Sequence, residues 1–226
     1  MKVTGHERFK SVYWVELDDG ARKLATVNLA RGNQVYGERL VEIDGVEYRL
    51  WDPYRSKLAA AIMKNMKENP INPGKIVLYL GAASGTTSSH VSDLVGPNGS
   101  IYCVEISSRP LRDLLVVCSK RPNMTPILAD ARQPSSYCAL VEKADIIYQD
   151  VAQPDQTDIL LANVRTFLQD GGYAMLALKA RSIDVTRDPS EIFKDEMGRL
   201  EEEMEIVDAK ILDPYERDHA MLVLRK

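Results

Sequence analysis

The spacing of hydrophobic residues changes about fifty residues into the chain. Before that point, apolar and polar residues alternate in short runs, and turn-forming pairs such as Asp44-Gly45 separate the runs. Alternation with a period of two between turn signals is typical of antiparallel strands joined by hairpins. We therefore predict a small β-rich subdomain over residues 1–52, with its clearest hairpin at residues 43–46.

From Lys75 onward, apolar runs of strand length alternate with longer amphipathic stretches. This pattern is typical of a parallel sheet that helices cover on both faces. The predicted strands are residues 75–81, 100–107, 125–130, 144–151 and 173–180. The predicted helices are 86–95, 109–120, 134–142 and 156–168, preceded by one that begins near residue 55 and ends at Asn69-Pro70.

Two further apolar runs, 204–213 and 220–226, follow one another with no helix between them. A direct connection between neighbouring strands makes them antiparallel. Residues 53–226 are thus expected to form an α/β domain with a mostly parallel sheet and an antiparallel last strand.

Composition and charge restrict the class of protein. The 226 residues are 45% hydrophobic and 27% charged, which excludes disordered and fibrous chains, and no apolar run reaches the length of a membrane span. The three cysteines lie far apart without CxxC spacing, which favours free thiols in the cytoplasm. The histidines have no metal-ligand companions, so no metal site is expected.

The formal net charge is −4, and acidic residues are concentrated near the C-terminus. Residues 191–218 contain eleven acids and four bases, a balance of −7, so the rest of the chain carries +3. An acidic total disfavours tight, unaided binding to a polyanion. It does not exclude RNA as a substrate that a partner presents.

The first strand of the α/β domain is followed by a loop of small residues, Gly81–Thr87, that opens a helix. The dinucleotide fingerprint G-x-G-x-x-G fails, because Ala83 stands where the second glycine is required, and Gly-Lys-Ser/Thr is absent. A nucleoside without phosphates is therefore the better ligand, although the loop also suits a plain tight turn.

Acidic side chains end three successive strands. Ligands of open α/β sheets bind at these carboxyl ends, where Glu105 is placed for ribose hydroxyls and Asp130 for an adenine amino group. Asp150 ends the next strand, and Lys179 ends the fifth beside it, which suggests a cation–carboxylate pair in a cleft. The alternatives are helix N-caps for the acids and a lysine that extends to solvent at the sheet rim.

Long segments of the chain resemble the fibrillarin family of guide-RNA-directed RNA 2′-O-methyltransferases. They include LYLGAASGTTSSHVSDLVGPNGSIYCVEISSRPLRDLL, PILADARQP, DIIYQDVAQPDQ, LALKARSIDVT and PYERDHAMLV, and the likeness runs from about Tyr36 to the end. The Arg/Gly-rich extension of the eukaryotic members is absent, so the chain is similar to the archaeal form. The resemblance implies a class I methyltransferase fold: a Rossmann-like, seven-stranded, mostly parallel sheet.

The resemblance also implies S-adenosylmethionine as the cofactor. On that basis the glycine-rich loop surrounds the methionine end and sugar, Glu105 binds the ribose, Ile106 and Asp130 lie at the base, and Asp150 flanks the sulfonium. The full set of implied cofactor-binding residues is Gly81, Ala82, Ala83, Gly85, Thr86, Thr87, Glu105, Ile106, Asp130, Ala131, Asp150, Val151, Ala152 and Gln153.

The implied catalytic residues are Lys57, Asp150, Lys179 and His219. Two readings of the lysines stay open. In one, Lys179 takes the proton of the ribose hydroxyl with help from the neighbouring cation of Lys57; in the other, both lysines stay charged and only align the hydroxyl. Arg181 and Arg187 are candidates for contacts with substrate phosphates.

The implied partners are a box C/D guide RNA with its rRNA or tRNA target, a Nop-family scaffold protein and a kink-turn-binding protein of the ribosomal type. Two other functions remain: a catalytically silent binding module with the same fold, and a methyltransferase that acts on a glutamine side chain of a protein.

Overall fold

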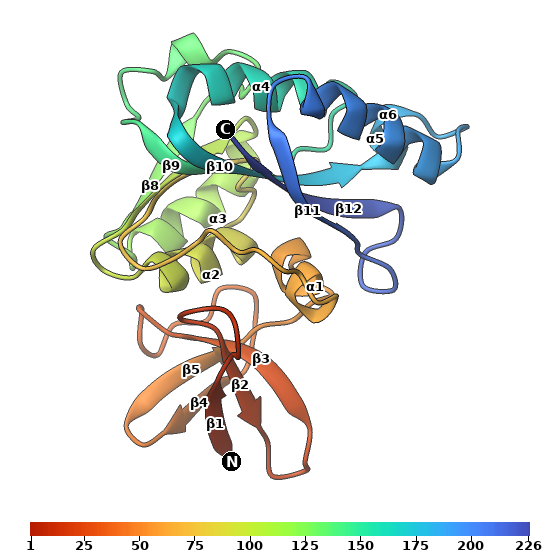
Figure 1. Cartoon of the computed structure of the whole chain (residues 1–226). Helices are drawn as coiled ribbons and strands as arrows, with labels where there is room; N and C mark the ends of the chain where they lie inside the picture. The colour runs from red at the N-terminus through yellow and green to blue at the C-terminus, as the bar shows by residue number, and fades with distance from the viewer.

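The computed structural model describes residues 1–226 and divides their strands between two sheets (Figure 1). The first sheet has five antiparallel strands in the order β1-β2-β3-β5-β4. β1 spans Lys2–Gly5, β2 Tyr13–Glu16, β3 Arg22–Val27, β4 Leu40–Ile43 and β5 Val46–Leu50. The small N-terminal β sheet expected from the alternating pattern is therefore present, and the domain boundary after residue 52 stays a prediction.

The β4–β5 hairpin forms where the Asp44-Gly45 pair predicted it. Ile43 pairs with Val46, and both turn residues have positive φ, 52° at Asp44 and 78° at Gly45. Positive φ at both central positions matches the right-handed twist of the flanking strands. The sheet has its own small core, which includes Val15 and Val41.

The second sheet has seven strands in the order β11-β12-β10-β9-β6-β7-β8. Neighbouring strands from β10 to β8 are parallel, whereas β12 is antiparallel to both of its neighbours. The seven-stranded, mostly parallel sheet is thus confirmed. β6 spans Ile76–Leu80, β7 Ser100–Glu105, β8 Met124–Leu128, β9 Ala144–Gln149, β10 Leu168–Lys179, β11 Glu205–Ile211 and β12 His219–Arg225.

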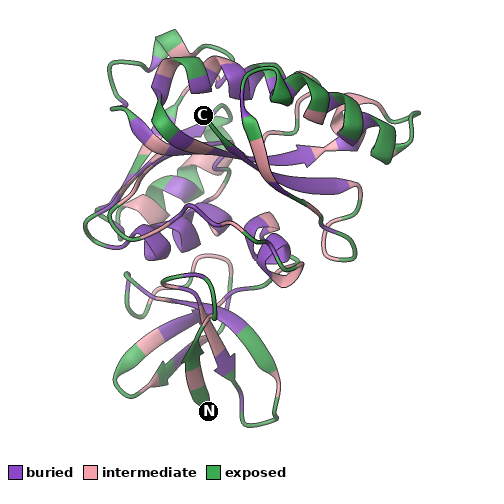
Figure 2. Ribbon diagram, in the orientation of Figure 1, coloured by how far each residue is buried: buried purple, intermediate pink, exposed green.

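Helices cover both faces of this sheet (Figure 1). One face is covered by α1, α2 and α3, and the other by α4, α5 and α6, so the strands between them are buried (Figure 2). α1 spans Lys57–Met63, α2 Thr86–Val95, α3 Ser108–Cys118, α4 Gln156–Phe167, α5 Ala180–Ile183 and α6 Pro189–Glu201. No helix is both long and apolar enough to cross a membrane.

Two predicted helices were wrong in part. α1 ends at Met63 rather than at Asn69-Pro70, because Asn65 adopts a left-handed conformation with φ 59° and closes a Schellman motif. Only Pro134–Ser136, a 3-10 turn, is helical within 134–142. There Tyr137 is held by the tertiary fold instead, since its ring stacks on Phe167 and its hydroxyl donates to Asn163.

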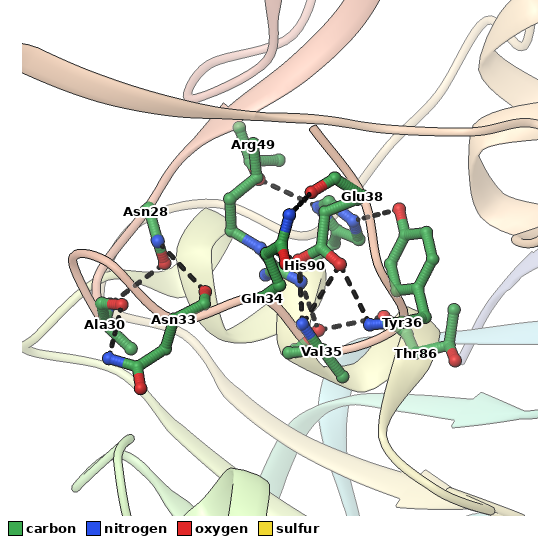
Figure 3. Close-up of polar contacts among 12 residues, drawn as sticks. Asn28, Ala30, Asn33, Gln34, Val35, Tyr36, Glu38, Arg49, Thr86 and His90 are labelled. Carbon is green, nitrogen blue, oxygen red and sulfur yellow. Dashed lines mark hydrogen bonds and ion pairs between the residues drawn. The ribbon is translucent and has the colours of Figure 1, made fainter. Parts of the chain in front are cut away.

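A buried polar network joins the first sheet to α2 (Figure 3). Arg49 of β5 is fully buried and pairs with Glu38 at 2.6 Å and with Asp93 of α2 at 2.8 Å. Arg121, which follows α3, reaches the other oxygen of Asp93 at 2.5 Å and the side chain of Asn28 at 3.0 Å. Two cations thus neutralise two buried carboxylates, which is the condition for burying charge at all.

His90 of α2 lies in the same network as a neutral imidazole (Figure 3). The Thr26 hydroxyl lies 2.8 Å from an oxygen of Asp93, which only accepts, so its proton points there. Nδ1 of His90, 2.8 Å from the same hydroxyl, must therefore carry hydrogen, and Nε2 accepts from the Tyr36 hydroxyl at 2.8 Å.

We expect His90 to make the protein less stable in acid. Burial lowers the pKa of His90 well below its usual value, and Arg49 and Arg121 lower it further. Below about pH 6.5 the unfolded chain then binds a proton that the folded chain does not, so the free energy of unfolding falls by up to about 1.4 kcal/mol per pH unit. Urea unfolding at pH 7.5 and 5.5 should show this loss in the wild type and a smaller one in His90→Gln. Equal losses in both proteins would assign the acid sensitivity to other groups.

Candidate active site

A partly open cavity lies at the carboxyl ends of β6, β7, β8 and β9. Carboxylates of three strand ends, Glu105, Asp130 and Asp150, face it. The other residues of its wall are Gly81, Ala83, Val104, Ile106, Ala129, Ala131, Arg132, Val151, Ala152, Gln153 and Ile159.

Gly81 lets the loops after β6 and β9 approach each other closely. Its φ is +81°, and a Cβ built on it would lie 2.4 Å from the backbone oxygen of Asp150. No larger residue fits there without displacing the backbone, so the shape of this end of the cavity depends on Gly81.

Two backbone N–H groups hold the Glu105 carboxylate in place. Ala83 donates to Oε2 and Ser107 donates to Oε1, each at 2.8 Å. Each carboxylate oxygen has two lone pairs, so both keep one free for a ligand hydroxyl. A fixed carboxylate with two free acceptor positions suits a pair of neighbouring hydroxyls.

The rest of the cavity is carboxylate-rich and partly apolar. Asp130 accepts from the backbone N–H of Arg132, whose guanidinium pairs with Asp155 at 2.7 Å and is thereby neutralised. The Ile106 side chain is 56% exposed at the cavity wall, which suits the face of an aromatic base. A cavity whose uncompensated charge is negative favours a cationic ligand over a phosphate.

Four residues implied as cofactor contacts lie outside this cavity. Ala82 is 5% exposed and packs in the core, and Gly85 packs against α3. Thr86 lines a separate groove beside α3, and the Thr87 hydroxyl donates to Ser56. The structure therefore brings the first half of the loop to the cavity and uses the second half to anchor α2.

Lys57 and Asp150 meet at the edge of the cavity. Nζ of Lys57, the first residue of α1, lies 3.1 Å from both carboxylate oxygens of Asp150. The pair is only partly exposed, 19% for the lysine side chain and 24% for the aspartate. The expected pair of Asp150 with Lys179 was wrong, because the start of α1, 93 residues away in sequence, brings Lys57 to that carboxylate instead.

Lys179 lies at the end of β10, where it pairs in register with His219 of β12. Its Nζ makes no hydrogen bond or ion pair with the rest of the chain. Its backbone is held on both sides by Gln156, which accepts from the Lys179 N–H at 2.9 Å and donates to its carbonyl at 3.1 Å. The amine of Lys179 is thus unpaired, while its backbone is held in place.

His219 is buried beside these residues. Burial lowers the pKa of His219, and the positive charge of Lys57 lowers it further, whereas the Arg217 carbonyl and the acids Glu216 and Asp150 oppose the shift. Nδ1 donates to that carbonyl at 2.7 Å, so Nε2 is the free nitrogen of a neutral ring. A neutral imidazole there does not add a third cation to the set.

The arginines expected near substrate phosphates are already paired. Arg181 pairs with Asp218 at 3.0 Å, and Arg187 with Asp195 of α6 at 2.6 Å. Of the three basic residues predicted to contact phosphates there, Lys179, Arg181 and Arg187, only Lys179 has no carboxylate partner. No group of three or more His, Cys, Asp or Glu side chains forms a metal site.

The family follows from comparison with known proteins. A family model described as Fibrillarin matches residues 3–226. This chain belongs to the fibrillarin family. The resemblance indicated by the sequence motifs is thereby confirmed.

Relatives within the fibrillarin family match over the whole chain. The fibrillarin-like rRNA/tRNA 2′-O-methyltransferase of Thermococcus gammatolerans is 54% identical over 226 residues, 100% of each chain. The crystal structure of Aeropyrum pernix fibrillarin with natively bound S-adenosyl-L-methionine is 53% identical, with a TM-score of 0.93 over 99% of this chain and 98% of that one. A fibrillarin/Nop5p complex matches at 43% identity, with a TM-score of 0.86 over 97% and 99%.

Sequence reasoning missed several residues of the site. Gln156 is fully buried and reaches both Lys179 and the carbonyl of Gln153, yet a glutamine at a helix start gives no chemical signal. Ile159 lines the cavity from α4, and Arg132 lines it two residues after Asp130, whose carboxylate alone gave a chemical signal. Knowledge of which helix covers the strand ends was needed to find them.

Gly81→Ala should damage both folding and ligand binding. The new Cβ would overlap the Asp150 carbonyl and force a left-handed alanine, so we expect a loss of roughly 2–4 kcal/mol in the free energy of unfolding. Isothermal titration should show at least about tenfold weaker binding of S-adenosylmethionine, since 1.4 kcal/mol is a tenfold change in affinity.

Gly20→Ala is the matched control. Gly20 has the same left-handed φ, +82°, but nothing lies within 4 Å of its Cβ position. In Gly20→Ala the free energy of unfolding should fall only by the cost of a left-handed alanine. This variant should bind S-adenosylmethionine with wild-type affinity. An equal loss of affinity in both variants would show that the contact with Asp150 is unimportant.

Proposed function

We propose that this chain is the catalytic subunit of a guide-RNA-directed ribonucleoprotein. It is an S-adenosylmethionine-dependent RNA 2′-O-methyltransferase, and its substrates are ribose hydroxyls of rRNA and tRNA. The observation that carries the mechanism is the Lys57–Asp150 pair at the edge of a cavity with three carboxylates, with the unpaired Lys179 at the end of β10, the strand next to β9. The modification serves rRNA processing and tRNA modification.

The cavity residues fit the cofactor. The carboxylate of Glu105 offers two free acceptor positions for the ribose hydroxyls, and Ile106 offers an apolar wall for adenine. The close approach at Gly81 leaves no room for a side chain, and the negative lining suits a sulfonium. S-adenosylmethionine supplies, when bound, a methyl group that is already activated for transfer.

The chain's own residues then have two tasks, to align the ribose hydroxyl and to remove its proton. The carboxylate of Asp150 forms an ion pair with the amine of Lys57, and this contact fixes both side chains. Lys179 has no carboxylate partner, so its amine is available to the hydroxyl. Gln156 holds the backbone of Lys179 and thereby its position. His219 contributes a neutral nitrogen beside this group.

The partners follow from the family and from charge. A fibrillarin relative forms a complex with Nop5p, and this chain has the same fold over nearly its whole length. We therefore propose a Nop-family scaffold protein, a box C/D guide RNA that pairs with the target, and a kink-turn-binding protein. A net charge of −4 agrees with a subunit whose RNA is presented by partners.

We also propose that the protein works in the cytoplasm. All three cysteines are free in the structure, and Cys103 is buried. Free thiols persist in reducing compartments.

Reconstitution tests the function directly. The chain is combined with a box C/D guide RNA, a Nop-family scaffold and a kink-turn-binding protein, and methyl transfer to a complementary RNA is mapped. Methylation of one ribose, lost when the guide is omitted or its sequence is scrambled, supports the proposal. Methylation of a protein glutamine instead, or cofactor binding without any transfer, would contradict it.

A further inference from the structure

Most arginines on the surface of this protein are neutralised. Arg22, Arg31, Arg132, Arg165, Arg181, Arg187, Arg199 and Arg225 each pair with a carboxylate within 4.0 Å. The exceptions are Arg8, Arg39, Arg55, Arg109, Arg112 and Arg217. Two of the exceptions, Arg39 and Arg55, line one groove.

This groove lies on the first sheet, beside the segment that leads into α1. Lys23, Arg39 and Arg55 line it, all are exposed, and no carboxylate lies within ion-pair distance of any of them. The groove also contains Glu38, but its carboxylate is buried and bound to Arg49 (Figure 3). Asp52 lies in the groove with the three cations, and Asp18, which pairs with the N-terminal amine, lies close enough to Arg39 for a weak attraction. We call Lys23, Arg39 and Arg55 with the surface between them the basic groove.

Lys23 lies on β3 and Arg39 directly precedes β4, on opposite sides of β5, whereas Arg55 lies in the segment between β5 and α1. The Leu50 N–H bonds the Arg39 carbonyl, and the next residue, Trp51, bonds the carbonyl of Leu24, the neighbour of Lys23. Neighbouring strands are about 4.8 Å apart, so the backbones at Lys23 and Arg39 are about 10 Å apart across β5. Arg55 also lines the groove, and its guanidinium lies 5.7 Å from the centre of the Tyr36 ring.

The basic groove adjoins the catalytic residues. Arg55 is two residues before Lys57, and the ring of its neighbour Tyr54 packs edge-on against Tyr215 at 5.1 Å. Tyr215 lies in the β11–β12 connection that leads to His219. One end of the groove, at Tyr54 and Arg55, therefore lies near the start of α1 and the β11–β12 connection, and the other end lies on the first sheet.

We propose that the basic groove binds the sugar–phosphate backbone of the RNA strand that carries the methylated nucleotide, on one side of that nucleotide. This inference rests on the proposed function. Guanidinium groups match phosphate oxygens in two hydrogen bonds at once, and phosphate contacts fix register without reading sequence. Sequence-independent positioning is what an enzyme needs when a guide RNA selects its target. The exposed ring of Tyr54 at one end of the groove also suits stacking on an unpaired base.

The test uses the reconstituted ribonucleoprotein with Arg39→Gln, Arg55→Gln and the double variant. Each single variant should raise the KM for target RNA roughly threefold and the double variant about tenfold, as expected for exposed ion pairs that add independently. The dependence of log KM on log salt should become shallower by about 0.7 to 0.9 per lost phosphate contact. The Kd for S-adenosylmethionine should stay at the wild-type value.

Arg8→Gln is the matched control. Arg8 is an exposed arginine of the same N-terminal region, has no carboxylate partner and lies outside the groove. Its KM and salt dependence should equal those of the wild type, and Arg55→Lys should recover part of the loss at position 55 because the charge returns. Wild-type KM and salt dependence in the double variant would overturn the inference.

A photo-crosslinker placed at position 39 identifies the occupant. Crosslinks to the target strand near the methylated nucleotide support the inference, whereas crosslinks only to the guide strand or to the scaffold protein overturn it. Failure of the wild-type complex to methylate RNA would instead contradict the proposed function, so the two failures are distinguishable.

Discussion

Lys179→Ala should slow methyl transfer in a single turnover by about 10²–10⁴-fold, the range for losing a group that moves a proton in the transition state. Asp150 is bound to Lys57 at 3.1 Å, so Lys179 supplies the amine of this set that no carboxylate holds. The Kd for S-adenosylmethionine should change little, because Lys179 does not line the cavity. Single-turnover rates with saturating cofactor and preassembled guide complex give the measurement.

Lys179→Arg separates the two readings of this residue. Arginine keeps the positive charge, but it does not lose its proton near neutral pH and so cannot act as a base. If Lys179 takes the proton of the hydroxyl, the arginine variant should be as slow as the alanine variant. If Lys179 only aligns the hydroxyl by its charge, arginine should restore much of the rate. A wild-type rate in Lys179→Ala would remove the residue from the catalytic set.

Arg49→Met should lower the free energy of unfolding by about 3–5 kcal/mol, because it leaves the buried carboxylates of Glu38 and Asp93 without their shared cation. For a chain of this size, that loss corresponds to roughly 10 °C in the unfolding midpoint. Thermal and urea unfolding measure it. Since Arg49 joins the first sheet to α2, limited proteolysis should also release the N-terminal sheet more readily.

Arg31→Met provides the comparison for Arg49. Arg31 also pairs with a glutamate, Glu42, at 2.7 Å, but both side chains are more than half exposed. An exposed pair contributes at most about 1 kcal/mol. Similar losses of unfolding free energy in the two variants would mean that the buried ion pairs of Arg49 stabilise the protein no more than an exposed pair does.

The buried network also bears on how RNA reaches the site. Arg39 and Lys23 lie on the first sheet, whereas Lys179 and Asp150 lie on the second. The Arg49–Asp93 ion pair fixes the two sheets relative to each other through α2. A strand held in the basic groove is thereby kept in a defined position relative to the catalytic lysines.

The sequence by itself determined the features that depend on local pattern. The period-two segments produced the first sheet, and the alternating apolar runs produced the parallel sheet with an antiparallel end. α2 occupies residues 86–95 as predicted, since the glycine-rich loop and Gly96 mark its two ends. Strand ends meet at one edge of a parallel sheet, so Glu105, Asp130 and Asp150 reach one cavity whatever the loops do.

Only the tertiary structure decided which charges meet. Asp150 was expected beside Lys179, but α1 supplies Lys57 from far along the chain. Arg187 is neutralised by α6, whereas Arg55 is left free, although nothing in the sequence distinguishes a paired arginine from an unpaired one. Hydrophobic periodicity reports which face of an element is buried, whereas an ion pair depends on the distance between residues that the sequence separates. That distance is set by packing, so the catalytic pairings and the basic groove appear only once the helices and both sheets are in place.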